Sequence, residues 1–234
     1  MIKRFFKKNS SGKTAEDFMK KSWSQCGEDL ILHHIFHELR LDKPTWIDIG
    51  AHHPFYLNNT FLFYSQGARG INIEPDPSLC QQFVKERPKD INLNFAIGEQ
   101  SGELDFYIFN EPTLNTLVKE EADRIHKEHP GYFVKEVCKV KIEPLDQVIE
   151  KYAQGKFPDL LSLDVEGLDE QILKSIPFEK TAPKVICVET ISFSTQGRGV
   201  KSVAIPEFLK SKGYMVYADT NINTLFVKEN LWQK

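Results

Sequence analysis

The stretch TWIDIGAHH, residues 45–53, decides the fold class when it is read together with GINIEP, residues 70–75. Each stretch contains a short apolar run that leads to a carboxylate, Asp48 in the first and Glu74 in the second, 26 residues apart. That distance accommodates one helix and two turns, the spacing of a βαβ unit that binds a nucleoside at the carboxyl ends of its strands. We therefore expect both carboxylates at strand ends, with Glu74 placed to accept hydrogen bonds from a ribose diol.

Strand-like and helix-like patterns alternate along most of the chain, which predicts an α/β fold with a mostly parallel sheet. The last two strands differ, because a short polar turn joins them into a hairpin and makes the last pair antiparallel. Sheets that bind a dinucleotide usually keep this strand parallel. We expect sheet strands at 45–49, 70–73, 91–97, 159–163 and 184–188, an exposed strand at 103–109, an edge strand at 137–142, and the hairpin at 214–218 and 224–228.

The 234 residues suit a single α/β domain preceded by a basic segment. Residues 1–23 form the segment, which we interpret as a flexible leader; weak docking to an anionic membrane surface is the alternative. Residues 24–234 form the domain, with a helical lid at 24–43 and a helical insert at 110–135.

Composition excludes several classes of protein. The net charge of −3 gives no global attraction to nucleic acid. The four cysteines are far apart and form no CxxC pair, so we expect reduced thiols and a cytoplasmic location. No apolar run approaches the ~20 residues that a transmembrane helix needs, and the basic N-terminus lacks the apolar segment of a signal peptide.

Acidic residues recur at or near the expected carboxyl ends of the strands, where a doubly wound sheet binds its ligands. A helix N-cap is the alternative role for each of them. Gly50 would let the backbone approach a ligand closely, but a GxGxxG cradle is absent, which counts against NAD and FAD. Ala96 and Ile97 would offer an apolar contact to an adenine. The acids are Asp48, Glu74, Asp164, Glu166 and Glu189.

The stretch LDVEG, residues 163–167, supplies the second group of acids. Asp164 could deprotonate a substrate hydroxyl, or it could bind Mg²⁺ or Mn²⁺ together with Glu189. A metal would help because a carboxylate is a weak base for an alcohol. His52 and His53 follow the first turn, and we expect them to face the pocket as a base or as substrate contacts.

Five short motifs follow one another along the chain: SQCGED at 24–29, IDIGAHHP at 47–54, NNT at 58–60, GINIEPDP at 70–77 and SLDVEG at 162–167. This series resembles the successive motifs of the FkbM family of methyltransferases, from about Ser24 to Thr190. The resemblance implies a class I Rossmann-like methyltransferase fold, for which a reversed last strand is typical. It also implies S-adenosylmethionine as the methyl donor and O-methylation of a hydroxyl.

The motif match also implies roles for individual residues. Asp48, Gly50 and Glu74 would hold the cofactor. Gln25 and Glu28 would close over the pocket. Asp48 would orient the turn and a cofactor amine or a water molecule.

Asp164 would lie beside the transferred methyl group. The chain departs from many members at residues 51–53, where they have Ala-Asn, and at Ser162, where they have Lys. Both departures leave the acceptor and the base open. Because members act on sugars, glycolipids and polyketides, we expect a small-molecule, glycan or glycolipid acceptor.

Two other classes of function remain as alternatives. A nucleotide-dependent oxidoreductase would use the same type of sheet, although the missing glycine fingerprint and the terminal hairpin argue against it. A binding module that has lost catalysis would retain the cofactor contacts. The complete set of acids argues against such a loss.

Overall fold

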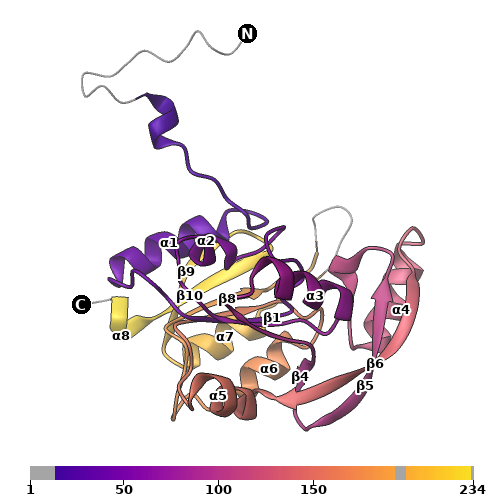
Figure 1. Cartoon of the computed structure of the whole chain (residues 1–234). Coiled ribbons are helices and arrows are strands. Elements are labelled where there is room, and N and C mark those ends of the chain that lie inside the picture. Colours follow the sequence, from indigo (N-terminus) through magenta and orange to yellow (C-terminus); the bar gives the residue numbers. More distant parts are fainter. Residues whose placement is uncertain (1–13, 193–198, 233–234) are drawn as a thin grey trace.

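The computed structural model describes residues 14–192 and 199–232 and has a seven-stranded sheet at its centre (Figure 1). The strand order is β3-β2-β1-β7-β8-β10-β9, and β10 alone runs antiparallel to both of its neighbours. The predicted fold, a mostly parallel sheet with one reversed strand of the class I methyltransferase type, is confirmed. The strands are β1 Trp46–Ile49, β2 Ile71–Ile73, β3 Ile91–Leu93, β7 Leu160–Leu163, β8 Val185–Glu189, β9 Tyr214–Asp219 and β10 Asn223–Lys228.

Helices cover both faces of this sheet, and the alternation of side chains along each strand decides which residues meet them. Ile47 and Ile49 of β1 point to the face covered by α5, α6 and α7, whereas Trp46 points to the face covered by α1 and α2. α3 begins at Pro77 because the Asp76 side chain caps it, accepting from two backbone N–H groups. The helices are α1 Glu28–Glu38, α2 Phe61–Ser65, α3 Pro77–Glu86, α5 Leu145–Ala153, α6 Asp169–Ser175, α7 Ala204–Ser211 and the terminal turn α8 Glu229–Trp232.

A second, three-stranded sheet lies beside the main one, with the order β4-β6-β5 and with α4 packed against it (Figure 1). The expected single strand at 91–97 is wrong. It is split in two because the chain bends after Leu93, where the Asn94 side chain donates to the carbonyls of Glu74 and Pro75, both at 2.9 Å. The expected edge strand at 137–142 is also wrong, since β6 is the central strand of this sheet. The elements are β4 Ala96–Gly98, β5 Gly102–Phe109, the 3-10 helix Pro112–Leu114, α4 Lys119–Glu128 and β6 Val134–Pro144.

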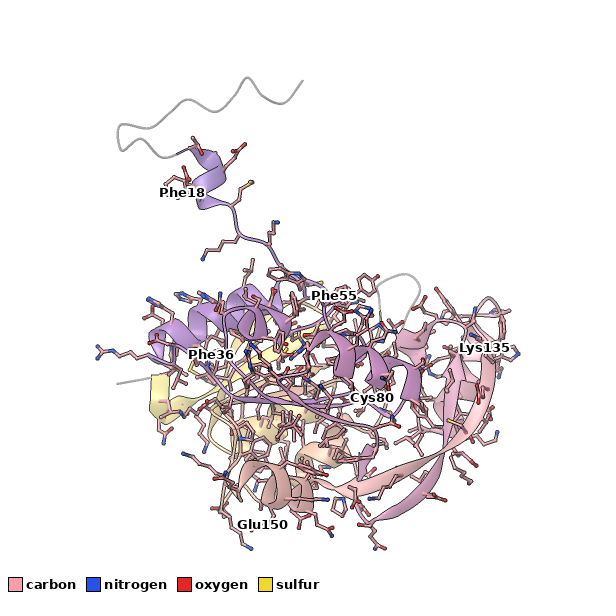
Figure 2. All side chains as sticks on the ribbon, viewed as in Figure 1. Phe18, Phe36, Phe55, Cys80, Lys135 and Glu150 are labelled. Carbon is pink, nitrogen blue, oxygen red and sulfur yellow. The ribbon has the colours of Figure 1, made fainter. Side chains whose placement is uncertain are left out.

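The first described residues comprise a segment that projects from the domain and a segment that is hydrogen-bonded to it. Residues 14–21 project from the domain and include the 3-10 helix Ala15–Phe18, with Phe18 exposed (Figure 2). Ser22 and Trp23, expected in the leader, are instead tied to the domain, since both donate to the carboxylate of Asp29. The predicted leader otherwise lies largely outside the described residues.

Helix α1 is a structural layer and not a lid. Its side chains Leu32, Ile35 and Phe36 are buried against the sheet, with Phe36 stacked edge-on against Phe63 at 5.3 Å. The predicted lid at 24–43 is therefore reduced to the loop that precedes α1. Among the described residues, none of the helices has the length and apolar character needed to cross a membrane.

Candidate functional site

A cavity of about 430 Å³ opens at the carboxyl ends of β1, β2, β7 and β8. The topology brings these four strand ends together, as the sequence predicted for a doubly wound sheet. Two predicted site residues, Glu28 and His53, do not line it. Those that do are Gln25, Asp48, Gly50, His52, Glu74, Ala96, Ile97, Asp164, Glu166 and Glu189.

Gly50 forms the floor of the cavity in a conformation that other residues rarely adopt, with φ +75°. A Cβ atom at this position would lie 1.7 Å from the backbone oxygen of Asp164. Only glycine therefore lets the turn after β1 lie against the loop after β7.

Glu74 is 5% exposed, and each of its carboxylate oxygens accepts one backbone hydrogen bond. The donors are the N–H groups of His52 and Asp76, both at 2.8 Å. Burial raises the pKa of Glu74 to about 8, and the two hydrogen bonds oppose the shift. The carboxylate is thus fixed in position and retains lone pairs for hydroxyl groups of a ligand.

Asp48 points to the opposite face of β1 from Ile47 and Ile49. Its carboxylate accepts a hydrogen bond from the Thr60 hydroxyl at 3.1 Å and another from Ser162. Burial raises the pKa of Asp48, whereas the nearby guanidinium of Arg87 lowers it. Sequence reasoning found Asp48 but missed Thr60 and Arg87.

The two histidines have different environments. His52 lines the cavity, and burial lowers its pKa, so its ring is neutral at pH 7. The His53 Nδ1 accepts from the backbone N–H groups of Phe55 and Tyr56 at 3.3 and 3.0 Å. His53 therefore shapes the turn behind the cavity wall, and the structure brings only His52 to the pocket.

Three carboxylates gather on the other side of the cavity. Asp164, Glu166 and Glu189 each place one oxygen within 4.8 Å of the other two. Within the described part of the chain, no side-chain hydrogen bond or ion pair reaches them. Burial raises the pKa of all three, and repulsion by neighbouring carboxylates adds to the shift. This group can share protons or hold a cation.

The loop after β7 presents Asp164 and Glu166 in a strained conformation. Glu166 has φ +51° and Gly167 has φ +107°. The loop is held by Asp169, whose carboxylate accepts from Val165 N at 3.2 Å and Gly167 N at 3.4 Å. Thr116 adds a hydrogen bond to the Glu166 carbonyl at 2.9 Å. Asp169, the first residue of α6, was missed as a site residue.

The insert expected at 110–135 forms one wall of the cavity. Residues 111–117 and Tyr132 line it. Asn115 fixes this wall, since its side chain accepts from Phe109 N at 2.8 Å and donates to Asp76 at 3.2 Å. The sequence predicted the insert but gave no sign that it closes the pocket, because its polar residues resemble those of a solvated loop.

The loop before α1 supplies Gln25 to the mouth of the cavity. Glu28 instead turns away from it: its carboxylate accepts from Thr220 Oγ1 at 2.7 Å, Asn223 Nδ2 at 3.1 Å and Cys26 N at 2.8 Å. Glu28 therefore fastens the loop to the turn between β9 and β10 and positions Gln25 without contacting the cavity.

Residues 48–216 match the family model described as the methyltransferase FkbM domain. The chain belongs to the FkbM methyltransferase family. This match confirms the predicted family and argues against the oxidoreductase alternative.

Two solved structures are similar to this FkbM chain. One is the methyltransferase FkbM from Methylobacillus flagellatus KT, with 15% identity and a TM-score of 0.47, covering 80% of this chain and 44% of that one. The other is a precorrin-6y C5,15-methyltransferase from Geobacter metallireducens GS-15, with 14% identity and a TM-score of 0.39, covering 85% and 87%. The chain thus spans less than half the length of the M. flagellatus protein. No curated protein matches it.

Proposed function

We propose that this FkbM-family protein is an S-adenosylmethionine-dependent O-methyltransferase that acts on a hydroxyl of a sugar, glycan, glycolipid or related small molecule. The observation that carries the proposal is the position of Asp164. Its carboxylate, which has no protein partner among the described residues, shares one cavity with the fixed carboxylate of Glu74 and the open turn at Gly50. The cytoplasmic location is supported by four free cysteines.

The residues present fit the cofactor. Gly50 lets the turn after β1 pack against the loop after β7 where both line the cavity, and Glu74 has acceptor capacity for the two ribose hydroxyls. Ala96 and Ile97 offer an apolar surface to the adenine, and Asp48 offers a carboxylate to the amino group. When bound, S-adenosylmethionine supplies an electrophilic methyl group.

The acceptor hydroxyl needs in-line placement and the removal of its proton. Placement supplies much of the rate enhancement. Asp164 is the residue we assign to the proton, because its raised pKa brings it closer to the working pH of a general base. The neutral ring of His52, in the same cavity, is the next acceptor along the path.

The same acids offer a second version of the chemistry. Mg²⁺ or Mn²⁺ held by Asp164 and Glu189, with Glu166 nearby, would lower the pKa of the acceptor hydroxyl. Chelation separates the two versions. We expect EDTA to leave turnover unchanged if Asp164 acts directly; loss of turnover that Mg²⁺ or Mn²⁺ restores would establish the metal version.

The first experiment is calorimetry of the full chain with S-adenosylmethionine, S-adenosylhomocysteine and NAD. We expect the first two to bind and NAD not to bind. A mass-spectrometric screen against sugar, glycan and lipid extracts then identifies the acceptor by a mass gain of one methyl group. Cofactor binding with no methylated product from any extract would favour the binding module instead.

A further inference from the structure

Arg87 follows α3 and is completely buried, with 0% of its surface exposed. Its Nε and Nη2 atoms both lie 2.8 Å from one oxygen of Asp90. The guanidinium also faces the rings of Trp46, Tyr64 and Phe83, with Cζ to centroid distances of 5.3, 5.1 and 5.2 Å. A buried charge is costly unless it is paired and hydrogen-bonded, so this arrangement calls for a role.

The remaining donors of Arg87 hold the loop that runs from β1 to α2. Nη1 donates to the carbonyl of Pro54 at 3.3 Å and to Asn58 Oδ1 at 3.1 Å. Asn58 lines the cavity and donates in turn to the carbonyls of Ala51 and His53 at 3.3 and 3.0 Å. Arg87 therefore supports the cavity wall from behind.

A relay also connects Arg87 to Asp48. The Thr60 hydroxyl oxygen lies 3.0 Å from Nη1 and 3.1 Å from Nη2, so it faces the guanidinium as an acceptor. Its single proton has two acceptors within reach, Asp48 Oδ2 at 3.1 Å and Asn58 Oδ1 at 3.0 Å.

Asn58 Oδ1 is already crowded with donors. It accepts from Thr60 N at 3.0 Å, Phe61 N at 2.8 Å and Arg87 at 3.1 Å. The Thr60 proton is therefore left for Asp48. The polarity of the chain of hydrogen bonds runs in one direction, from the guanidinium through the hydroxyl to the carboxylate.

We propose that Arg87 is a positioning residue for cofactor binding, which acts through Thr60 to orient the Asp48 carboxylate toward the cavity. The inference rests on the proposed function, because it takes Asp48 as a contact of the methyl donor. It assigns a task to a buried cation that touches neither the cavity nor the ligand.

Other groups near Asp48 make its charge depend on this support. Burial raises its pKa, Arg87 is the strongest opposing influence, and Asp90 raises the pKa further. The ionisable groups that interact with Asp48 from neighbouring elements are Arg87, Asp90, Glu74, Asp164 and Cys187. All except Arg87 are acidic, so removal of the relay leaves Asp48 with a higher pKa.

The test is calorimetric titration of the full chain with S-adenosylhomocysteine between pH 6.5 and pH 9. In Thr60→Val the hydroxyl is lost while Arg87 keeps Asp90. We expect binding weaker by about tenfold across this range, because the carboxylate loses a donor that orients it, and a larger loss at the acidic end, because loss of that donor raises the pKa of Asp48. Thr60→Ser, which keeps the hydroxyl, should restore the wild-type profile.

Glu74 and Asp164, with pKa values raised to about 8 and about 7, titrate in this range in both wild type and variant, so only the difference between the two profiles is assigned to loss of the Thr60 hydroxyl. An equal affinity and an unchanged pH profile in Thr60→Val would overturn the relay. Arg87→Met should show a larger loss than Thr60→Val; if its melting curve shows that it does not fold, Thr60→Val decides the question. Absence of binding by the wild type would instead overturn the proposed function.

Discussion

The carboxylates at the ends of β1 and β2 accept hydrogen bonds from the protein, whereas those near the ends of β7 and β8 accept none among the described residues. Asp48 and Glu74 each have two donors from this chain. Asp164, Glu166 and Glu189 instead crowd one another within 4.8 Å. The β1–β2 half of the cavity is therefore held in a fixed geometry before a ligand binds. The acids of the β7–β8 half keep their acceptor capacity for a proton, a cation or a substrate.

The physical meaning follows from the cost of unpaired charge. A buried carboxylate that accepts hydrogen bonds from the protein keeps a fixed geometry, which suits the binding of a cofactor that is the same in every reaction. A group of carboxylates that accepts no hydrogen bonds from the protein binds protons or a cation instead. It can therefore interact with the hydroxyl of the methyl acceptor. We therefore assign binding to the β1–β2 half and chemistry to the β7–β8 half.

The largest expected effect is in the β7–β8 half. Asp164→Asn keeps the shape of the side chain but removes its capacity as a base or metal ligand. We expect turnover with the true acceptor to fall about 1,000-fold, within the range for general-base catalysis. Affinity for S-adenosylhomocysteine should stay within a few-fold of wild type. Near-normal turnover would remove Asp164 from the mechanism.

The next effect lies in the β1–β2 half. Glu74→Gln replaces a charged acceptor of ribose hydroxyls with a neutral one, and hydrogen bonds to charged groups contribute ~1.5–3 kcal/mol. We expect S-adenosylhomocysteine to bind about 10- to 100-fold more weakly at pH 9, measured by calorimetry. The matched control is Glu189→Gln, the same change in the other half, which should leave this affinity nearly unchanged. Equal losses of affinity in both variants would contradict the assignment of cofactor binding to the β1–β2 half alone.

A smaller effect is expected at the mouth. Gln25→Ala removes one neutral side chain from the loop that Glu28 fastens, and a neutral hydrogen bond contributes ~0.5–1.5 kcal/mol. We expect up to about tenfold weaker binding of S-adenosylhomocysteine. Lys20→Ala, in the projecting segment, serves as the control and should bind like wild type. Wild-type affinity in Gln25→Ala would exclude the loop as a lid.

The smallest effect concerns the stability of the ligand-free protein. Glu74 has its pKa raised from 4.5 to about 8, so the folded state holds a proton that the unfolded state releases. Stability from this group is therefore lost as pH rises from 4.5 toward about 8. Burial lowers the pKa of His52 and His53, which acts in the opposite direction below pH 6.5.

The measurement accordingly covers pH 7.5 to 9, where His52 and His53 are mostly neutral in the unfolded state as well as in the folded state. We expect the melting temperature to fall by a few degrees over this range, since ~1 kcal/mol corresponds to about 2–4 °C for a domain of this size. Glu74→Gln should make the fall shallower without removing it, because Glu166 and Glu189 also have raised pKa values. An unchanged slope in Glu74→Gln would contradict the raised pKa of Glu74.

Much of the fold and part of the site were predictable. The strand positions followed from short apolar runs, and the acids at their ends from the general rule for parallel sheets. The prediction failed at 91–97, where Asn94 bends the chain toward the carbonyls of Glu74 and Pro75. It failed again at His53, because its Nδ1 accepts hydrogen bonds from the backbone of Phe55 and Tyr56. The sequence pattern gives no sign of this turn.

The sequence by itself determined the α/β class, the reversed β10 and the two groups of acids, because local patterns of apolar residues and turns specify them. Only the tertiary structure decided which acids find partners. Glu28 meets Asn223 across 195 positions of the chain, and Arg87 meets Asn58 and Thr60 from the far end of α3. Such contacts form between segments brought together by burial of the core, so a buried carboxylate that binds a ligand and one that fastens a loop look the same until the chain has folded.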